Sequence, residues 1–194
     1  MQFCKIEKEG FKFPNFRLNK GELIRFWVQV VPINEKDKFN WGLKTINEII
    51  EEYNRELDVE IKFCNNKVKL SLLDFIKPVS VSRYLNEKFG HREKEILAYL
   101  SHFGIEPNYT IRRMGFAHQK IFAIINTIEN NDLVSFDLYG FAPLTAIELI
   151  NYTKRKLDSN KSFLIFDNFF LKGDHTAHSK IRDIDILRPN IPLT

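Results

Sequence analysis

The stretch Asn130 to Pro143, NNDLVSFDLYGFAP, carries an apolar run that ends on Asp137. An aspartate at the carboxyl end of a sheet strand can hold the magnesium ion of a bound nucleotide. The next residue, Leu138, cannot accept a hydrogen bond from an attacking water. The pair therefore indicates one of three things: a hydrolytic site, a disabled one, or a strand that simply ends in an aspartate.

A second candidate is the segment Gly42 to Thr45, GLKT. A phosphate-binding loop needs glycines, whose backbone N–H groups wrap the phosphates, and a lysine that reaches the outer phosphates. Lys44 and Thr45 echo such a Gly-Lys-Thr sequence, with one residue inserted after the glycine. The segment also opens a predicted helix that Thr45 can cap, with Glu48 as its capping-box partner. We favour the capping interpretation and keep Lys44 and Thr45 as an alternative nucleotide site.

The run GDHTAH places Asp174, His175 and His178 within five residues, and these groups could bind zinc or another metal. The run offers no further ligand and follows the last long apolar strand, so we favour a solvated surface and expect no metal. A Ser-His-Asp arrangement is also disfavoured, because no GxSxG elbow is present in the sequence.

The charges limit the class of partner. The 194 residues carry 29 Lys and Arg against 25 Asp and Glu, and the two signs are interspersed, which argues against nucleic acid as a partner. Cys4 and Cys64 form no metal or redox spacing, which indicates a reducing compartment. No apolar run approaches the ~18 residues of a membrane span, and the N-terminus lacks a signal sequence. We therefore expect a cytoplasmic protein, with a peripheral position at the inner face of the membrane as the alternative.

The pattern of elements predicts the α/β class. Strand, helix and strand alternate from Asp132 to Asp167, which indicates a mostly parallel sheet. The continuous apolar run from Leu23 to Val31 predicts a buried strand, and short antiparallel strands are predicted before it. Further strands are predicted over VEIKFC and KVKLSLL, and residues 80–130 are helical in pattern, with Gly90 as a C-terminal cap. The helix between the last two strands is predicted over PLTAIELINYTKRKL. We expect a single domain over residues 1–194, with a helical subdomain at about 78–118.

The register from Gln119 to Asp137 resembles that of an ATP-binding cassette (ABC) ATPase domain. In that family a glutamine and a basic residue open a helix, an AIARAL-type run follows, and an NPD turn leads to the strand carrying the magnesium aspartate. Here Gln119, Lys120, AIINTI, NND and LVSF lead to Asp137 without a gap. The phrase FRLNKGELIRF is similar to the family's approach to its phosphate loop. The resemblance implies a P-loop NTPase fold that extends from about residue 10 to about residue 170.

The diagnostic residues of the family are nearly all replaced. The position of the family's first phosphate-loop glycine holds Val28, and the following segment, QVVPINEKD, contains no glycine. In the signature segment, Arg113 to Ala117, only Gly115 survives, and we expect Met114 and Phe116 to obstruct a phosphate. The other replaced positions are Leu138 for the catalytic glutamate, Ala142 for the interface aspartate, Asn168 for the switch histidine, and Asp74 where a glutamine is expected.

The resemblance therefore implies a non-catalytic, pseudo-ATPase member that acts through protein–protein association. Its expected partner is another ABC-type subunit or a second copy, with a membrane transporter subunit as a further candidate. We expect no cofactor. The alternative is a divergent ATPase that binds ATP and magnesium through Lys44, Thr45, Asp137 and Gly115. A nucleic-acid-associated ABC-type protein is the least favoured alternative.

Overall fold

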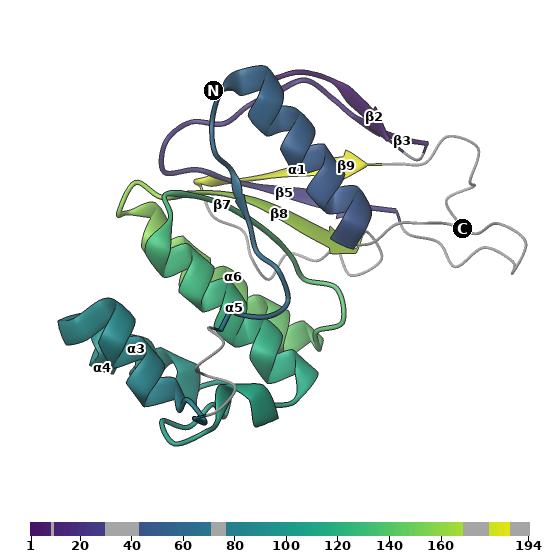
Figure 1. The fold of residues 1–194 in the computed structure, drawn as a ribbon. Coiled ribbons are helices and arrows are strands. Elements are labelled where there is room, and N and C mark those ends of the chain that lie inside the picture. The colour runs from purple at the N-terminus through teal and green to yellow at the C-terminus, as the bar shows by residue number, and fades with distance from the viewer. Residues whose placement is uncertain (9, 30–42, 71–76, 169–178, 187–194) are drawn as a thin grey trace, which may run out of the picture. The chain divides into compact units, whose positions relative to one another are not determined.

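The computed structural model describes residues 1–8, 10–29, 43–70, 77–168 and 179–186. The chain groups into two compact units, which are described separately. The first unit contains Met1–Cys64 and Asn130–Thr194, and the second contains Asn65–Glu129. In Figure 1 the labelled strands and the helices α1 and α6 belong to the first unit, and the helices α3, α4 and α5 belong to the second, apart from the last residue of α5.

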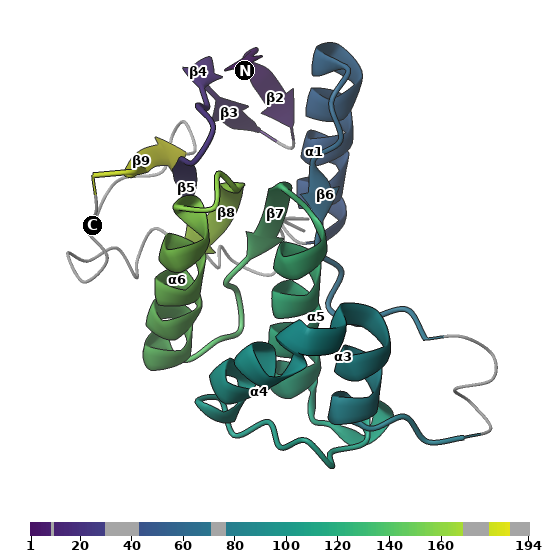
Figure 2. The same cartoon turned by 90° about the vertical axis from the view of Figure 1, so that its left-hand side faces the viewer.

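Within the described residues, the first unit is built on a five-stranded sheet of order β6-β7-β8-β5-β9 (Figure 2). Every neighbouring pair in it is parallel. The strands are β5 (Leu23–Val28), β6 (Lys62–Phe63), β7 (Leu133–Asp137), β8 (Ser162–Asn168) and β9 (Ile181–Ile186). All six residues of β5 are buried, because this strand has a parallel neighbour on each side and helices or strands over its faces.

Two helices of the first unit connect these strands. α1 (Leu43–Leu57) follows β5, and its apolar stripe of Ile46, Ile49, Ile50 and Tyr53 is buried. α6 (Pro143–Leu157) joins β7 to β8 as a crossover and starts with proline in its first turn.

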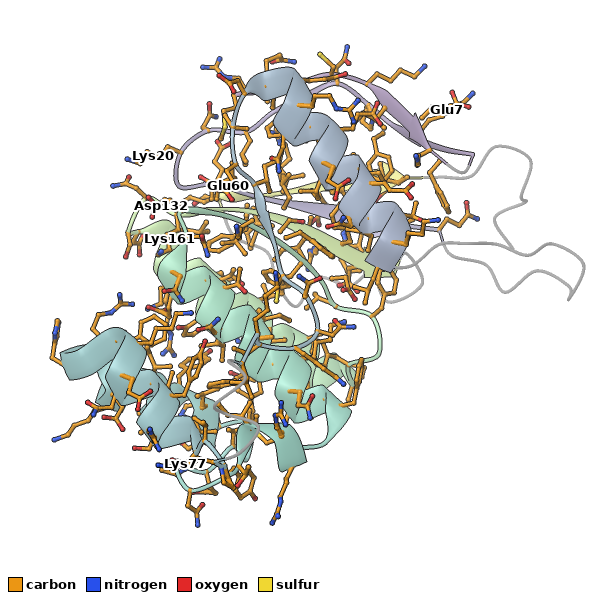
Figure 3. The ribbon with its side chains drawn as sticks, in the orientation of Figure 1. Glu7, Lys20, Glu60, Lys77, Asp132 and Lys161 are labelled. Atoms are coloured by element: carbon orange, nitrogen blue, oxygen red, sulfur yellow. The ribbon has the colours of Figure 1, made fainter. Side chains whose placement is uncertain are left out.

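The segment before β7 is held by Lys161. Its Nζ donates to the Asn131 backbone oxygen at 2.8 Å and lies 3.5 Å from the Asp132 carboxylate (Figure 3).

Short antiparallel strands precede the sheet: β1 (Gln2–Phe3) pairs with β4 (Phe16–Arg17), and β2 (Ile6–Lys8) pairs with β3 (Phe11–Phe13) (Figure 2). Their phenylalanines pack with those of the sheet. Phe3 stacks on Phe16 at 4.3 Å, and Phe16 meets Phe26 of β5 edge-on at 5.3 Å. The sequence contains 18 phenylalanines, and six of them are buried in the cluster that these strands form with the sheet and α1.

The second unit is helical in most of its described residues. Its elements are α3 (Val81–Phe89), η1 (Gly90–Arg92), α4 (Glu93–Ser101), η2 (Ile111–Arg113) and α5 (Phe116–Asn130). Ser80 caps α3 by accepting from the Arg83 amide at 3.2 Å, and Gly90 ends it with a φ of 54°. The Arg92 guanidinium forms an ion pair with Glu129, whose side chain is fully buried.

The predicted α/β class, the mostly parallel sheet, the antiparallel N-terminal portion and the helices are confirmed. Two local predictions were wrong. α1 begins at Leu43, so Thr45 lies inside its first turn instead of capping it. The strand predicted over KVKLSLL is absent from its described part, residues 67–70, because these residues pair with no neighbouring strand. No helix among the described residues is long and apolar enough to cross a membrane.

Candidate functional site

The candidate site lies where β7, β8 and β5 end. In the register of the sheet, Asp137 pairs with Phe166 of β8, and Phe166 pairs with Phe26 of β5. Since paired residues of parallel strands project to the same face, Asp137 shares a face with these two rings. Both rings belong to the hydrophobic cluster that includes Ile46 and Ile49 of α1. The sheet therefore presents Asp137 on the face that α1 covers.

Asp137 is 3% exposed, and its carboxylate closes the turn that follows β7. Its Oδ1 accepts a hydrogen bond from the Tyr139 amide at 3.0 Å. The Tyr139 hydroxyl in turn donates to the backbone oxygen of Asp167 at 3.1 Å, and Gly140 continues the turn with a φ of 80°. This is the local aspartate-to-backbone bonding that ends many strands, so the carboxylate has a structural role here.

Leu138 is 2% exposed and extends the ladder beyond β7, because its amide donates to the Phe166 oxygen at 2.9 Å. Its burial follows from this pairing, which draws the residue into the sheet. A buried aliphatic side chain can neither orient a water nor accept its proton. Leu138 therefore contributes to the packing of the hydrophobic core.

Val28, at the predicted position of the first phosphate-loop glycine, is part of β5. It is level with Asn168 on one side and Ile186 on the other, and its side chain is fully buried. The Gln29 amide extends the pairing by donating to the Ile186 oxygen at 3.0 Å. The backbone at this position is therefore extended and used in the sheet. Residues 30–42, including Gly42, lie outside the described part of the chain.

Lys44 and Thr45 both lie in the first turn of α1 but differ in exposure. Thr45 is 3% exposed, whereas the Lys44 side chain is 91% exposed. Lys44 Nζ lies 3.8 Å from Glu48, which also receives Lys8 at 2.8 Å. The hydrogen bond from Lys8 lowers the pKa of Glu48, and the charges of Lys8 and Lys44 act in the same direction. Lys44 thus faces solvent and an acidic neighbour.

Gly115 belongs to the second unit and precedes α5. It is exposed, and a Cβ added to it would meet nothing within 4 Å. Its oxygen accepts the Gln119 amide at 3.0 Å, and Gln119 Nε2 donates to the Met114 oxygen at 2.7 Å. Met114 is only 7% exposed, so the expectation that its side chain obstructs this surface was wrong. Phe116, at 59%, does stand on the surface.

The remaining predicted positions are less informative. Ala142 precedes the first turn of α6 in an extended conformation, and Asn168 is the last residue of β8. Asp74, Asp174, His175 and His178 lie outside the described residues. Within the part of the chain that the structure describes, no three His, Cys, Asp or Glu side chains gather as a metal site would require.

The structure adds an ion pair between the buried Arg25 and the exposed Asp183 that the sequence analysis missed. Arg25 of β5 donates to both carboxylate oxygens of Asp183 at 2.9 and 3.0 Å, and its guanidinium lies 4.2 Å over the Trp27 ring. The pair fixes β9 beside β5. An arginine inside the apolar run LIRFWV was the available signal, because a buried arginine needs an anionic partner.

Comparison with known proteins places this architecture in a recognised class. No protein-family profile matches the sequence, and no curated protein sequence matches it either. Solved structures do match in fold. The ADP conformation of an ATP-binding cassette of an ABC transporter aligns with a TM-score of 0.56 at 14% identity, over 96% of this chain and 90% of that one. A nucleotide-free ATP-binding cassette from an ABC transporter aligns with a TM-score of 0.51 at 13% identity, over the same shares.

At this level of identity the likeness concerns the fold. The chain has the α/β fold of ATP-binding cassettes, with a parallel sheet, antiparallel N-terminal strands and helices. The resemblance predicted from Gln119 to Asp137 is thereby confirmed as a likeness of fold. What the chain does with the fold rests on its own residues.

Proposed function

We propose that this chain is a non-catalytic ABC-type domain that acts by associating with another protein. Its partner is a second ABC-type subunit or another copy of itself, and a membrane transporter subunit is a further candidate. The proposal combines the cassette fold with residues that are poorly suited to hydrolysis.

The observation that carries the proposal is the end of β7. Asp137 Oδ1 accepts the Tyr139 amide, and the next residue, Leu138, is buried. A hydrolytic site needs a group there that accepts a proton or orients water, and leucine supplies neither. At this strand end one oxygen of Asp137 is used to form the turn, and Leu138 offers no polar side-chain atom.

The phosphate side supports the same proposal. Val28 is held in β5 by pairing on both sides, which leaves no loop at that position to wrap a phosphate. Lys44 is exposed beside Glu48. Both observations support the proposal, because neither the Val28 backbone nor the Lys44 side chain is arranged as a phosphate contact in the described part of the chain.

Equilibrium binding of a fluorescent ATP analogue in the presence of magnesium tests the proposal. We expect no saturable signal in the micromolar range. Saturable binding that disappears in Lys44→Ala would instead establish the alternative, a divergent ATPase that uses the Gly42 to Thr45 segment. Saturable binding unaffected by Lys44→Ala would contradict both accounts of the site.

A further inference from the structure

The charge of the chain is concentrated in its second unit. Residues 65–129 carry ten Lys and Arg against six Asp and Glu, which equals the net charge of +4 of the whole chain. The first unit carries nineteen of each and is neutral overall. An excess of one sign on one unit favours a partner of the opposite sign.

A surface pocket of the second unit combines this charge with apolar surface. The pocket has a volume of about 470 Å³ and is lined by Lys67, Val68, Leu70, Ile111, Arg112 and Gln119. Ile111 is buried and forms apolar floor, whereas Lys67 and Arg112 are exposed. Aliphatic lining with cationic groups at the edge suits a ligand that has both apolar and anionic groups.

One wall of the pocket is a chain segment with alternating exposure. Lys67 and Lys69 are exposed, while Val68 and Leu70 are half-buried, as expected for an extended segment with one face inward. An extended peptide that lies along this wall would meet apolar and cationic side chains in the same alternation.

Two other lining residues, Arg112 and Gln119, are joined by a hydrogen bond. Gln119 Nε2 donates to the backbone oxygens of Met114 and Arg112, at 2.7 and 3.3 Å. These bonds connect α5 to the turn that carries Arg112. They also use the amide nitrogen, which leaves the Gln119 side-chain oxygen as an acceptor for an incoming N–H.

We propose that this pocket binds an acidic, partly apolar segment of a partner protein in extended conformation. Aliphatic side chains of the segment contact Val68, Leu70 and Ile111, and its carboxylates pair with Lys67 and Arg112. The inference rests on the proposed function, since it names the chemistry of the protein that the domain associates with. It requires neither nucleotide binding nor hydrolysis.

Fluorescence anisotropy on the full chain tests the inference. The probe is a short fluorescein-labelled peptide in which Glu and Asp alternate with Leu and Val. A matched peptide carries Gln and Asn in place of the acids. We expect the acidic peptide to bind and the neutral one to bind at least about tenfold more weakly, because each charge-assisted contact contributes more than a neutral one.

Charge-reversal variants locate the binding. Lys67→Glu and Arg112→Glu should each weaken the acidic peptide about tenfold. Lys77→Glu in the same unit and Lys20→Glu in the first unit are matched controls, because both lysines are exposed and neither lines the pocket (Figure 3). We expect these controls to leave the affinity within about threefold, since they alter only the general field.

Three results would overturn the inference. Equal binding of the acidic and neutral peptides would remove its electrostatic basis. Equal loss in all four variants would show attraction by net charge instead of a pocket. Tighter, pocket-dependent binding of a single-stranded oligonucleotide would assign the surface to nucleic acid. ATP hydrolysis by the chain would refute the proposed function yet leave peptide binding unaffected, so the two failures are distinguishable.

Discussion

The backbone amide of Tyr139 donates a 3.0 Å hydrogen bond to Oδ1 of Asp137. This bond folds the chain back immediately after β7, and the Tyr139 hydroxyl then reaches the backbone of β8 at Asp167. Asp137 stands where the resemblance to ABC ATPases predicts a magnesium ligand. Its oxygen is used to shape the turn, which gives the aspartate a reason to be present without a nucleotide.

The turn bond predicts a difference between two substitutions of Asp137. Asp137→Ala leaves the Tyr139 amide without its acceptor and should lower the free energy of unfolding by about 1 to 3 kcal/mol. Asp137→Asn retains an oxygen at the same place and should cost clearly less. Urea denaturation followed by circular dichroism measures both. Equal losses for the two variants would show that the charge, and not the turn bond, is what the fold needs.

We expect that replacing Leu138 with glutamate, the residue of active family members, does not produce ATP hydrolysis. Leu138→Glu places a carboxylate in a position that is 2% exposed, so it should destabilise the domain by roughly 3 kcal/mol or more. Phosphate release from ATP should stay at background. Leu138→Met is the control, because it conserves volume and should cost less than about 1.5 kcal/mol. A folded Leu138→Glu variant that hydrolyses ATP would mean that the rest of the site is intact.

We expect the substitution of Lys44 to change neither the stability of the chain nor its response to nucleotide. Its side chain is 91% exposed and its carboxylate neighbour Glu48 has Lys8 as a closer partner. Lys44→Ala should therefore leave the melting temperature and the response to magnesium–ATP unchanged, since exposed ion pairs contribute little. Thermal denaturation with and without magnesium–ATP is the measurement. A nucleotide-dependent rise in melting temperature that Lys44→Ala removes would support a divergent nucleotide site.

The second unit depends on the pair between Arg92 and the fully buried side chain of Glu129. Arg92→Ala leaves a buried carboxylate without its cation. Because the Arg92 side chain is itself 37% exposed, we expect a loss of about 2 to 3 kcal/mol, less than for a fully buried pair.

Two variants control for this effect. Adding Glu129→Gln to Arg92→Ala should recover part of the stability, because the buried charge is then gone. Arg83→Ala breaks an exposed pair with Glu87 and should cost less than about 0.5 kcal/mol. Similar losses for Arg92→Ala and Arg83→Ala in urea denaturation would contradict the importance assigned to burial.

Much of the fold was predictable because its signals are local. The helix predicted over PLTAIELINYTKRKL matches α6, Pro143–Leu157, since a proline start and an apolar stripe occur together. The strand ending at Asp137 was likewise recognised from its apolar run. Gly90 ends α3 with a positive φ, as a glycine after a helical pattern indicates.

The features that were missed depend on contacts between distant segments. Thr45 lies within α1 with its side chain buried, although its local sequence favours a capping position. The pairing of Arg25 with Asp183 joins residues 158 positions apart, and local periodicity carries no information on it. The six residues that line the pocket come from three segments of the second unit, residues 67–70, η2 and α5. They become neighbours only when this unit folds.

Isothermal titration of the full chain with magnesium–ATP, combined with a phosphate-release assay, measures whether the domain binds or hydrolyses the nucleotide. We expect no binding heat in the micromolar range and no turnover above a protein-free blank. Asp137→Ala, run in parallel, should give the same two results as the wild-type chain. Micromolar binding by the wild-type chain, or turnover that Asp137→Ala abolishes, would contradict the account.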